Sequence, residues 1–260
     1  MSKMTQNGNP TVERLMQILR ELERSPHGLS RTELVEKTGL ARSSVYRILN
    51  SLEEHRMIRE LSTGTFVLGN RVLELANSVT HNSDFFRLAQ FLQPELEFLA
   101  FKIDQTCKIS IMESEAIMVI AGATPKAPHA LSYTIGEYLP IHAGGASKVL
   151  MAYLPEAERD RLLSRNLGAL TDKTITDKNL LAKELELIRK QGWAEDRGEY
   201  SLSVCSFAAP IFRHTGEVIA ALSIPFMKGA DDALRESLRE AAVNGANALS
   251  KSIEQYSFRP

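Results

Sequence analysis

The first 55 residues carry apolar positions at helical spacing, interrupted by glycine and proline. Val12–Glu23 brings several aliphatic residues to one face, so we predict a helix that ends before Pro26 and Gly28. Ser30 followed by Glu33 is a capping box, which predicts a short helix continuing to Thr38. Gly39 then predicts a sharp turn. A longer helix is expected from Ala41 to His55, with an apolar inner face formed by Val45, Ile48, Leu49 and Leu52.

A β-hairpin is predicted directly after these helices. Ile58–Leu61 and Thr65–Leu68 are the expected strands, with Ser62-Thr63-Gly64 at the tip. Arg71–Ser78 returns to helical spacing and is expected to connect two domains. A short helix, a tight turn, a second helix and a hairpin follow one another in a winged helix-turn-helix.

Beyond residue 80 helical and strand-like segments are mixed. The expected helices are Phe85–Phe101, Ala143–Leu154, Pro155–Leu163, Asn179–Gln191 and Asp231–Gln255. The expected strands are Thr106–Ser114, Ala116–Ala123, Leu131–Gly136, Trp193–Asp196, Ser206–Arg213 and Val218–Ile224, with a turn at Ser114-Glu115. This order predicts an α+β fold, an antiparallel sheet flanked by helices. We therefore expect a DNA-binding domain at 1–69, a linker helix at 70–80 and a second domain at 81–260.

Composition agrees with two globular domains in a chain of 260 residues. No apolar run is long enough to span a bilayer, and the polar N-terminus is unlike a secretory signal. We expect a cytoplasmic protein without a membrane partner. Cys107 and Cys205 fit buried thiols, although one disulfide between them is left open.

The net charge of −1 is divided unevenly along the chain. Residues 1–78 carry 11 Lys and Arg against 9 Asp and Glu, and the rest carries 20 against 23. The imbalance suits a basic module joined to an acidic domain, but a difference this small also arises by chance.

The second helix of the motif has the chemistry that a recognition helix needs. Its start is short and polar, so its backbone can approach DNA, and a helix N-terminus favours phosphate. The candidate donors to phosphates and base edges are Arg42, Ser43, Ser44, Tyr46, Arg47 and Asn50, with Arg31 before this helix and Arg59 and Thr63 in the hairpin. The alternative is structural: serines cap helices, arginines cover solvated faces, and Arg47 braces the domain.

The second domain shows a weaker signal for a binding site. Gly144-Gly145-Ala146 precedes a predicted helix, and amides at a glycine-rich helix start bind anions. Asp196, Ser206 and Ser223 fall on predicted strands. The alternative is that the glycines permit close packing and the serines satisfy local backbone groups.

Several segments in order resemble the IclR-type bacterial regulators. LSRTELVEKTGLARSSVYRILNSLEEHRMI and FVLGNRVLEL are similar to the family's DNA-binding domain and connector. GEYLPIHAGGASKVLMAYLP resembles the family's P-L-H-A-x-A-x-G-K segment. LTDKTITDKNLLAKELELIRKQGWAEDRGEYSLSVCSFAAPIF, followed by GEVIAALSI, resembles the remainder.

The resemblance implies a GAF-like effector domain and dimers or dimers of dimers. It also implies a site for a small carboxylate or a keto or aldehyde acid. Matched residue by residue, the site consists of the Gly145 and Ala146 amides, Asp196, Ser206 and Ser223, with Met112, Phe207 and Phe226 as apolar walls. A carboxylate at Asp196 would repel an anionic ligand unless it is protonated or accepts from a ligand hydroxyl.

Three departures from the family pattern leave the effector open. Ser147 and Ser203 stand at positions that are usually glycine. Ser206 stands where cysteine is frequent, and Cys205 comes one residue early, which strand alternation places on the opposite face.

An enzyme and a ligand-independent dimerisation module are the rival classes. His142, Ser147, Lys148, Asp196 and Cys205 would be the catalytic candidates. The chain has no G-x-S-x-G elbow, P-loop or C-x-x-C pair, and its six histidines are scattered. We therefore expect a regulator with no metal and no cofactor, and a hydrogen-bonding structural role for His142.

Overall fold

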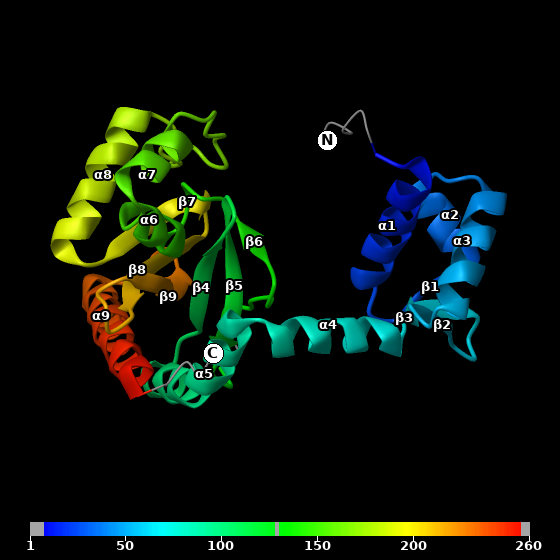
Figure 1. Cartoon of the computed structure of the whole chain (residues 1–260), viewed down its shortest axis with the longest axis horizontal. Coiled ribbons are helices and arrows are strands. Elements are labelled where there is room, and N and C mark those ends of the chain that lie inside the picture. Colours follow the sequence, from blue (N-terminus) through cyan, green and yellow to red (C-terminus); the bar gives the residue numbers. More distant parts are fainter. Residues whose placement is uncertain (1–7, 128–129, 256–260) are drawn as a thin grey trace. The chain divides into compact units, whose positions relative to one another are not determined.

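The computed structural model describes residues 8–127 and 130–255. The ends of both predicted domains, residues 1–7 and 256–260, lie outside this range. The chain divides into two compact units, Met1–Ser83 and Asp84–Pro260 (Figure 1). Helix α4 (Asn70–Asn82), which contains the predicted connector, falls in the first unit.

The first unit contains the predicted helix-turn-helix and hairpin. Its helices are α1 (Pro10–Glu23), α2 (Arg31–Thr38) and α3 (Arg42–Glu54), followed by α4. Strands β1 (Leu29–Ser30), β2 (Ile58–Glu60) and β3 (Thr65–Leu68) form an antiparallel sheet in the order β1-β3-β2. The sequence pattern missed β1, because two residues are too few for an alternation to show.

Local signals and a small core explain the fold of this unit. Both halves of the capping box are present, since Ser30 accepts from the Glu33 amide and Glu33 accepts from the Ser30 amide. Gly39 ends α2 with φ +65°, a left-handed conformation that favours glycine. The buried core combines residues of α1, α2, α3 and the sheet, among them Ile18, Leu34, Leu49 and Phe66.

The second unit is built on a six-stranded antiparallel sheet in the order β6-β5-β4-β9-β8-β7. Its strands are β4 (Cys107–Glu113), β5 (Ala116–Ala123), β6 (Tyr138–Leu139), β7 (Ala194–Ser201), β8 (Val204–Phe212) and β9 (Val218–Met227). Its helices are α5 (Asp84–Ile103), α6 (Gly145–Ala152), α7 (Glu156–Leu163), α8 (Lys178–Gln191) and α9 (Asp232–Gln255). The predicted α+β fold is confirmed.

Helices cover both faces of this sheet (Figure 1). Helices α5 and α9 pack on one side, and the core there includes Ile109, Phe207 and Leu222; we call it the α9 face. Helix α6 packs on the other side and contacts α8, and this core includes Val149, Ala208 and Ala221; we call it the α6 face. Because side chains alternate along a strand, neighbouring residues belong to different faces.

One predicted strand is wrong. Leu131–Gly136 forms no strand, and the short β6 follows it at Tyr138–Leu139. The segment is held by a few separate hydrogen bonds, one of which is a backbone bond from Gly136 N to Val119 O at 2.8 Å. Thr106 Oγ1 donates to Leu131 O at 2.6 Å, and Tyr133 OH donates to Gly122 O at 2.6 Å. Its apolar residues resembled a strand in sequence, but separate side-chain and backbone bonds fix the segment, and no continuous ladder forms.

The structure answers the question of the disulfide that the sequence left open. Cys107 and Cys205 are both free and buried, so they form no disulfide. Within the described ranges, no helix combines the length and apolarity that crossing a bilayer requires.

Candidate DNA interface and effector site

Helix α3 turns a polar face to solvent. Val45, Ile48 and Leu49 are buried, which fixes the opposite side of the helix outward. Ser43, Arg47 and Asn50 are exposed at spacings of four and three residues, so they share the centre of that face. Arg42 and Tyr46 flank it on one side. The partly buried Ser44 lies on the other side, where it lines a shallow groove with Arg47 and α1.

The start of α3 is open to a phosphate. Its N-cap is Ala41, and no side chain among the described residues caps the helix. The Ala41 carbonyl accepts from Ser44 and Val45, but this pattern leaves the amides of Arg42 and Ser43 without an intrahelical acceptor. Exposed N-terminal amides next to an arginine suit a phosphate oxygen.

Arg31 is held by the domain itself. Its guanidinium donates to Glu60 at 3.2 Å and stacks over Tyr46 and Phe66, at 5.5 and 5.0 Å from the ring centroids. These contacts of Arg31 join α2, α3 and the hairpin at the edge of the exposed polar face of α3. The geometry therefore favours a positioning role for Arg31 over a direct DNA contact.

The hairpin presents its two candidates to solvent. Arg59 is exposed on β2, and Thr63 at the tip shares a hydrogen bond with Thr65, 2.8 Å between hydroxyl oxygens. Nine candidates were named in this unit, and the structure places most of them on exposed parts of α3 and the hairpin.

In the second unit, four of the predicted effector residues meet on the α6 face. Asp196 on β7 lies directly opposite Ser206 on β8, and Ser223 on β9 lies opposite Ala208. A Cβ added to Gly145 would lie 2.9 Å from Ser206 Oγ and 3.1 Å from Ala208 Cβ, so the start of α6 touches β8. Asp196, Ser206 and Ser223 are all buried.

Helix α6 also begins without a side-chain cap from the described part of the chain. Gly144 at its N-cap has φ +105°, a conformation that an L side chain rarely adopts. The adjacent Gly145 and Ala146 are buried. A buried helix N-terminus with uncapped amides favours an anion more strongly than an exposed one, because water competes less there.

Asp196 does not project a free carboxylate at a ligand. Its Oδ1 accepts from the amides of Gly198 at 3.0 Å and Glu199 at 2.7 Å, which closes a bulge in β7. Burial raises the pKa of Asp196, whereas these amides and the charge of Lys148 oppose the rise. The amide bonds fix the position of Oδ1 and favour the ionised form, whereas burial favours the neutral form that an anionic ligand would meet without repulsion.

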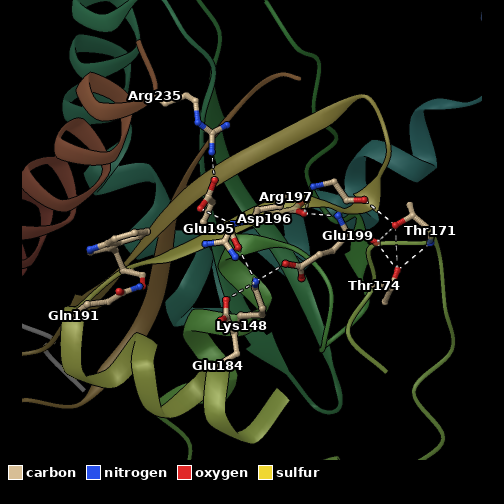
Figure 2. Close-up of polar contacts among 12 residues, drawn as sticks. Lys148, Thr171, Thr174, Glu184, Gln191, Glu195, Asp196, Arg197, Glu199 and Arg235 are labelled. Carbon is tan, nitrogen blue, oxygen red and sulfur yellow. Dashed lines mark hydrogen bonds and ion pairs between the residues drawn. The ribbon is translucent and has the colours of Figure 1, made fainter. Parts of the chain in front are cut away.

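A buried lysine joins α6, α8 and β7 (Figure 2). Lys148 is 0% exposed, and its Nζ donates to Glu199 Oε1 at 2.6 Å, Glu184 Oε1 at 3.1 Å and the Glu195 carbonyl at 2.6 Å. Burial raises the pKa of Glu199, and Lys148 opposes the rise. Figure 2 shows Thr171 and Thr174 on the other side of the β7 bulge, where their hydroxyls donate to the backbone.

The three apolar candidates do not all lie beside this cluster. Phe207 and Phe226 belong to the α9 face, where their rings stack at 5.4 Å and Arg235 lies over both. Strand alternation explains the error, because Phe207 follows Ser206 directly. Met112 is on the α6 face, but it lies four residues along β4 from Lys108, the residue that pairs with Ser223.

That residue, Lys108, is a functional candidate that the sequence reasoning missed. It lies opposite Ser223 on β9 and opposite Gly122 on β5, which places it on the α6 face. Burial lowers the pKa of Lys108, while Glu137 and Asp196 act against this shift. The alternation in Cys-Lys-Ile-Ser-Ile-Met could have identified Lys108, because it puts Lys108 and Ser110 on one face of the strand and the isoleucines on the other.

Catalytic and metal chemistry find no support in the geometry. His142 Nε2 lies 2.9 Å from Gly168 O, in line with its predicted structural role. Cys205 is on the α9 face, and burial raises the pKa of its thiol, which disfavours a nucleophilic thiolate. No group of three His, Cys, Asp or Glu residues suited to a metal occurs in the described part of the chain.

Comparison with known proteins agrees with this arrangement in both units. The model for "IclR helix-turn-helix domain" matches residues 11–62, and that for "Bacterial transcriptional regulator IclR C-terminal" matches residues 79–251. The HTH-type transcriptional regulator Rv1719 of Mycobacterium tuberculosis is 32% identical over 92% of this chain and 88% of its own.

Solved structures share the fold. The IclR of Thermotoga maritima aligns over 94% of this chain and 98% of its own, with a TM-score of 0.78 and 22% identity. An IclR homolog of Microbacterium hydrocarbonoxydans, solved with 4-hydroxybenzoate, aligns over 95% and 100%, with a TM-score of 0.73 and 22% identity.

A winged helix-turn-helix unit followed by this type of sheet domain defines a DNA-binding transcriptional regulator, not an enzyme. The chain belongs to the IclR family.

Proposed function

We propose that this regulator binds operator DNA through α3 and the hairpin, and that a small organic acid changes its affinity for DNA. The observation that carries the effector half is the buried, uncapped start of α6 against Ser206. An anion there would meet the Gly145 and Ala146 amides and the hydroxyls of Ser206 and Ser223.

A structural relative supports the choice of ligand class. The Microbacterium hydrocarbonoxydans homolog was solved with 4-hydroxybenzoate, a carboxylate that carries a hydroxyl. Carboxylate recognition also suits the polar groups on the α6 face. We extend the class, and not that particular acid, to this chain.

The DNA half of the proposal requires more than one copy of the chain. One winged helix contacts only a short stretch of duplex, so useful affinity needs two modules on half-sites about one helical turn apart, or a multiple of it. We therefore propose at least a dimer on DNA, acting in the cytoplasm.

For the acid to act as a switch, it must bind the DNA-competent and DNA-incompetent states with different affinities. A ligand with equal affinity for both would leave DNA binding unchanged. This condition separates a regulator with an effector from a ligand-independent dimerisation module.

The test combines fluorescence anisotropy on the DNA upstream of the gene with calorimetry against a panel of small acids. We expect one or more acids to bind and to change the DNA affinity. The double variant Ser206→Ala/Ser223→Ala should lose acid binding and keep apo DNA binding. Ser237→Ala, at an exposed serine on α9, is the matched control.

Two outcomes contradict the proposal separately. If the double variant binds the acid as tightly as the wild type, the site is elsewhere. If an acid binds and DNA affinity never changes, the second unit is not an effector switch.

A further inference from the structure

Two buried hydroxyls on the α6 side of the sheet lack a partner. Ser110 is 0% exposed and Ser147 is 1% exposed, and neither Oγ has a hydrogen-bond partner among the described residues. Buried hydroxyl groups in proteins are nearly always hydrogen-bonded to protein, water or ligand. Two such groups on the α6 side of the sheet therefore favour the binding of a polar ligand there.

Ser147 belongs to the first turn of α6. Its Oγ lies 3.7 Å from the place that a Cβ on Gly144 would occupy, so the hydroxyl faces the uncapped end of the helix. Ser110 is two residues from Lys108 on β4, which puts both on the same face of the strand.

One row of paired residues leads from α6 to Lys108. Gly145 touches Ala208, Ala208 lies opposite Ser223, and Ser223 lies opposite Lys108. Adjacent strands are about 4.8 Å apart, so Ala208 and Lys108 are about 10 Å apart at their backbones. A lysine side chain covers much of that distance, and a small molecule can fill the rest.

Two lysines on this side, both among the described residues, differ in their charge partners. Lys148 is already bound by Glu184, Glu199 and a carbonyl oxygen. Lys108 has no ion pair within 4.0 Å in the described ranges, although Asp196 and Glu137 act on it at longer range. An arriving carboxylate would therefore find its counter-charge at Lys108.

We propose that Lys108, Ser110 and Ser147 form a specificity subsite of the effector site and select a hydroxy- or oxo-substituted carboxylate. Lys108 pairs with the negative charge, and the two hydroxyls bind the additional oxygen. This inference rests on the proposed function, because it places the subsite beside the α6 start. It excludes an unsubstituted aliphatic acid as the preferred effector.

The charge part is tested by calorimetry on the full chain with pyruvate, 4-hydroxybenzoate and their neutral amides. The wild type should prefer each acid to its amide. Lys108→Met and Lys108→Gln should weaken acid binding at least tenfold and erase that preference, whereas Lys108→Arg should retain most of it. Lys183→Met removes an exposed lysine of α8 and should bind like the wild type. Thermal unfolding verifies that each variant is folded.

The hydroxyl part is tested by paired ligands that differ in one oxygen. Pyruvate against propionate and 4-hydroxybenzoate against benzoate are suitable pairs. The wild type should prefer the oxygenated member about tenfold, and Ser110→Ala/Ser147→Ala should reduce that preference to near unity. If the variant keeps the preference, water alone occupies these hydroxyls and this part is wrong.

The controls separate this inference from the proposed function. If acids bind, Ser206→Ala/Ser223→Ala abolishes binding and Lys108→Gln binds like the wild type, the inference fails and the effector site stands. If the wild type binds no acid in the panel, both are rejected.

Discussion

Helices α3 and α6 both begin without a side-chain cap within residues 8–127 and 130–255, yet they differ in burial. The first amides of α3 lie at the surface beside Arg42 and face water. Those of α6 are buried against Ser206. Under the proposed function, the same backbone feature meets a polymer in one unit and a small molecule in the other.

The proposal implies that burial determines which anion an open helix end selects. At an exposed end, salt screens the attraction and many phosphates must be contacted together, so DNA binding should weaken steeply with salt. At a buried end, hydrogen bonds and shape select the ligand, and added salt has little effect. The following substitutions test this comparison, starting with the largest expected effect.

Lys148→Met should destabilise the second unit by about 3–5 kcal/mol, because it leaves buried carboxylates without their cation. Trp193 is the only tryptophan and packs in this unit, so its fluorescence follows the unfolding in denaturant. Lys183→Met should change stability by less than about 0.5 kcal/mol.

The loss of stability in Lys148→Met should also depend on pH. Without Lys148 the pKa of Glu199, already raised by burial, rises further above its unfolded value. An acid with a raised folded pKa destabilises the fold when ionised, so the loss should shrink as pH falls from about 8 to about 5. If the loss of stability did not depend on pH, the ionised carboxylate of Glu199 would not be its cause.

Leu49→Ala should cost the first unit about 2–5 kcal/mol by opening a cavity beneath α3. Since this unit contains no tryptophan, its unfolding is followed by circular dichroism while Trp193 fluorescence stays unchanged. If Leu49→Ala shifted the circular dichroism and the Trp193 fluorescence together, the two units would unfold together and this prediction would be wrong.

Arg42→Ala and Arg47→Ala should each weaken operator binding by about 1–3 kcal/mol without loss of thermal stability, because both side chains are exposed. Arg20→Ala, on the exposed side of α1, is the charge-matched control. If Arg42→Ala leaves the operator affinity unchanged, α3 docks differently from the arrangement inferred here.

The smallest expected effect comes from a substitution at the uncapped start of α3. Ala41→Asp supplies the absent cap and should stabilise the first unit by about 1 kcal/mol. It should also weaken DNA binding, since the new carboxylate occupies the amides and repels phosphate. Gain of stability without loss of DNA affinity would show that these amides do not meet the backbone of DNA.

The sequence predicted what depends on local patterns. The Ser30 and Glu33 capping box, the Gly39 turn and the helix faces are set by neighbouring residues, and the structure confirms them. The Leu131–Gly136 strand was wrong because its fate depends on Thr106 and Tyr133, whose partners are distant in sequence.

The effector site also combines features set by local pattern with features that depend on residues distant in sequence. Alternation correctly separates Cys205 from Ser206, and the same alternation puts Phe207 and Phe226 on the α9 face, away from Ser206 and Ser223. Lys108 escaped notice because its importance depends on its pairing with Ser223 across the sheet. Such pairing is not encoded in the pattern of one strand.

The two thiols have a practical consequence for spectroscopy. Burial raises the pKa of Cys107 to about 12 and that of Cys205 above its ordinary value, so neither is a ready thiolate at neutral pH. Maleimides and oxidants react with thiolates at exposed sites, and should therefore modify both positions slowly. A cysteine introduced at an exposed residue such as His214 would be the preferred point of attachment for a fluorophore, with both native cysteines left in place.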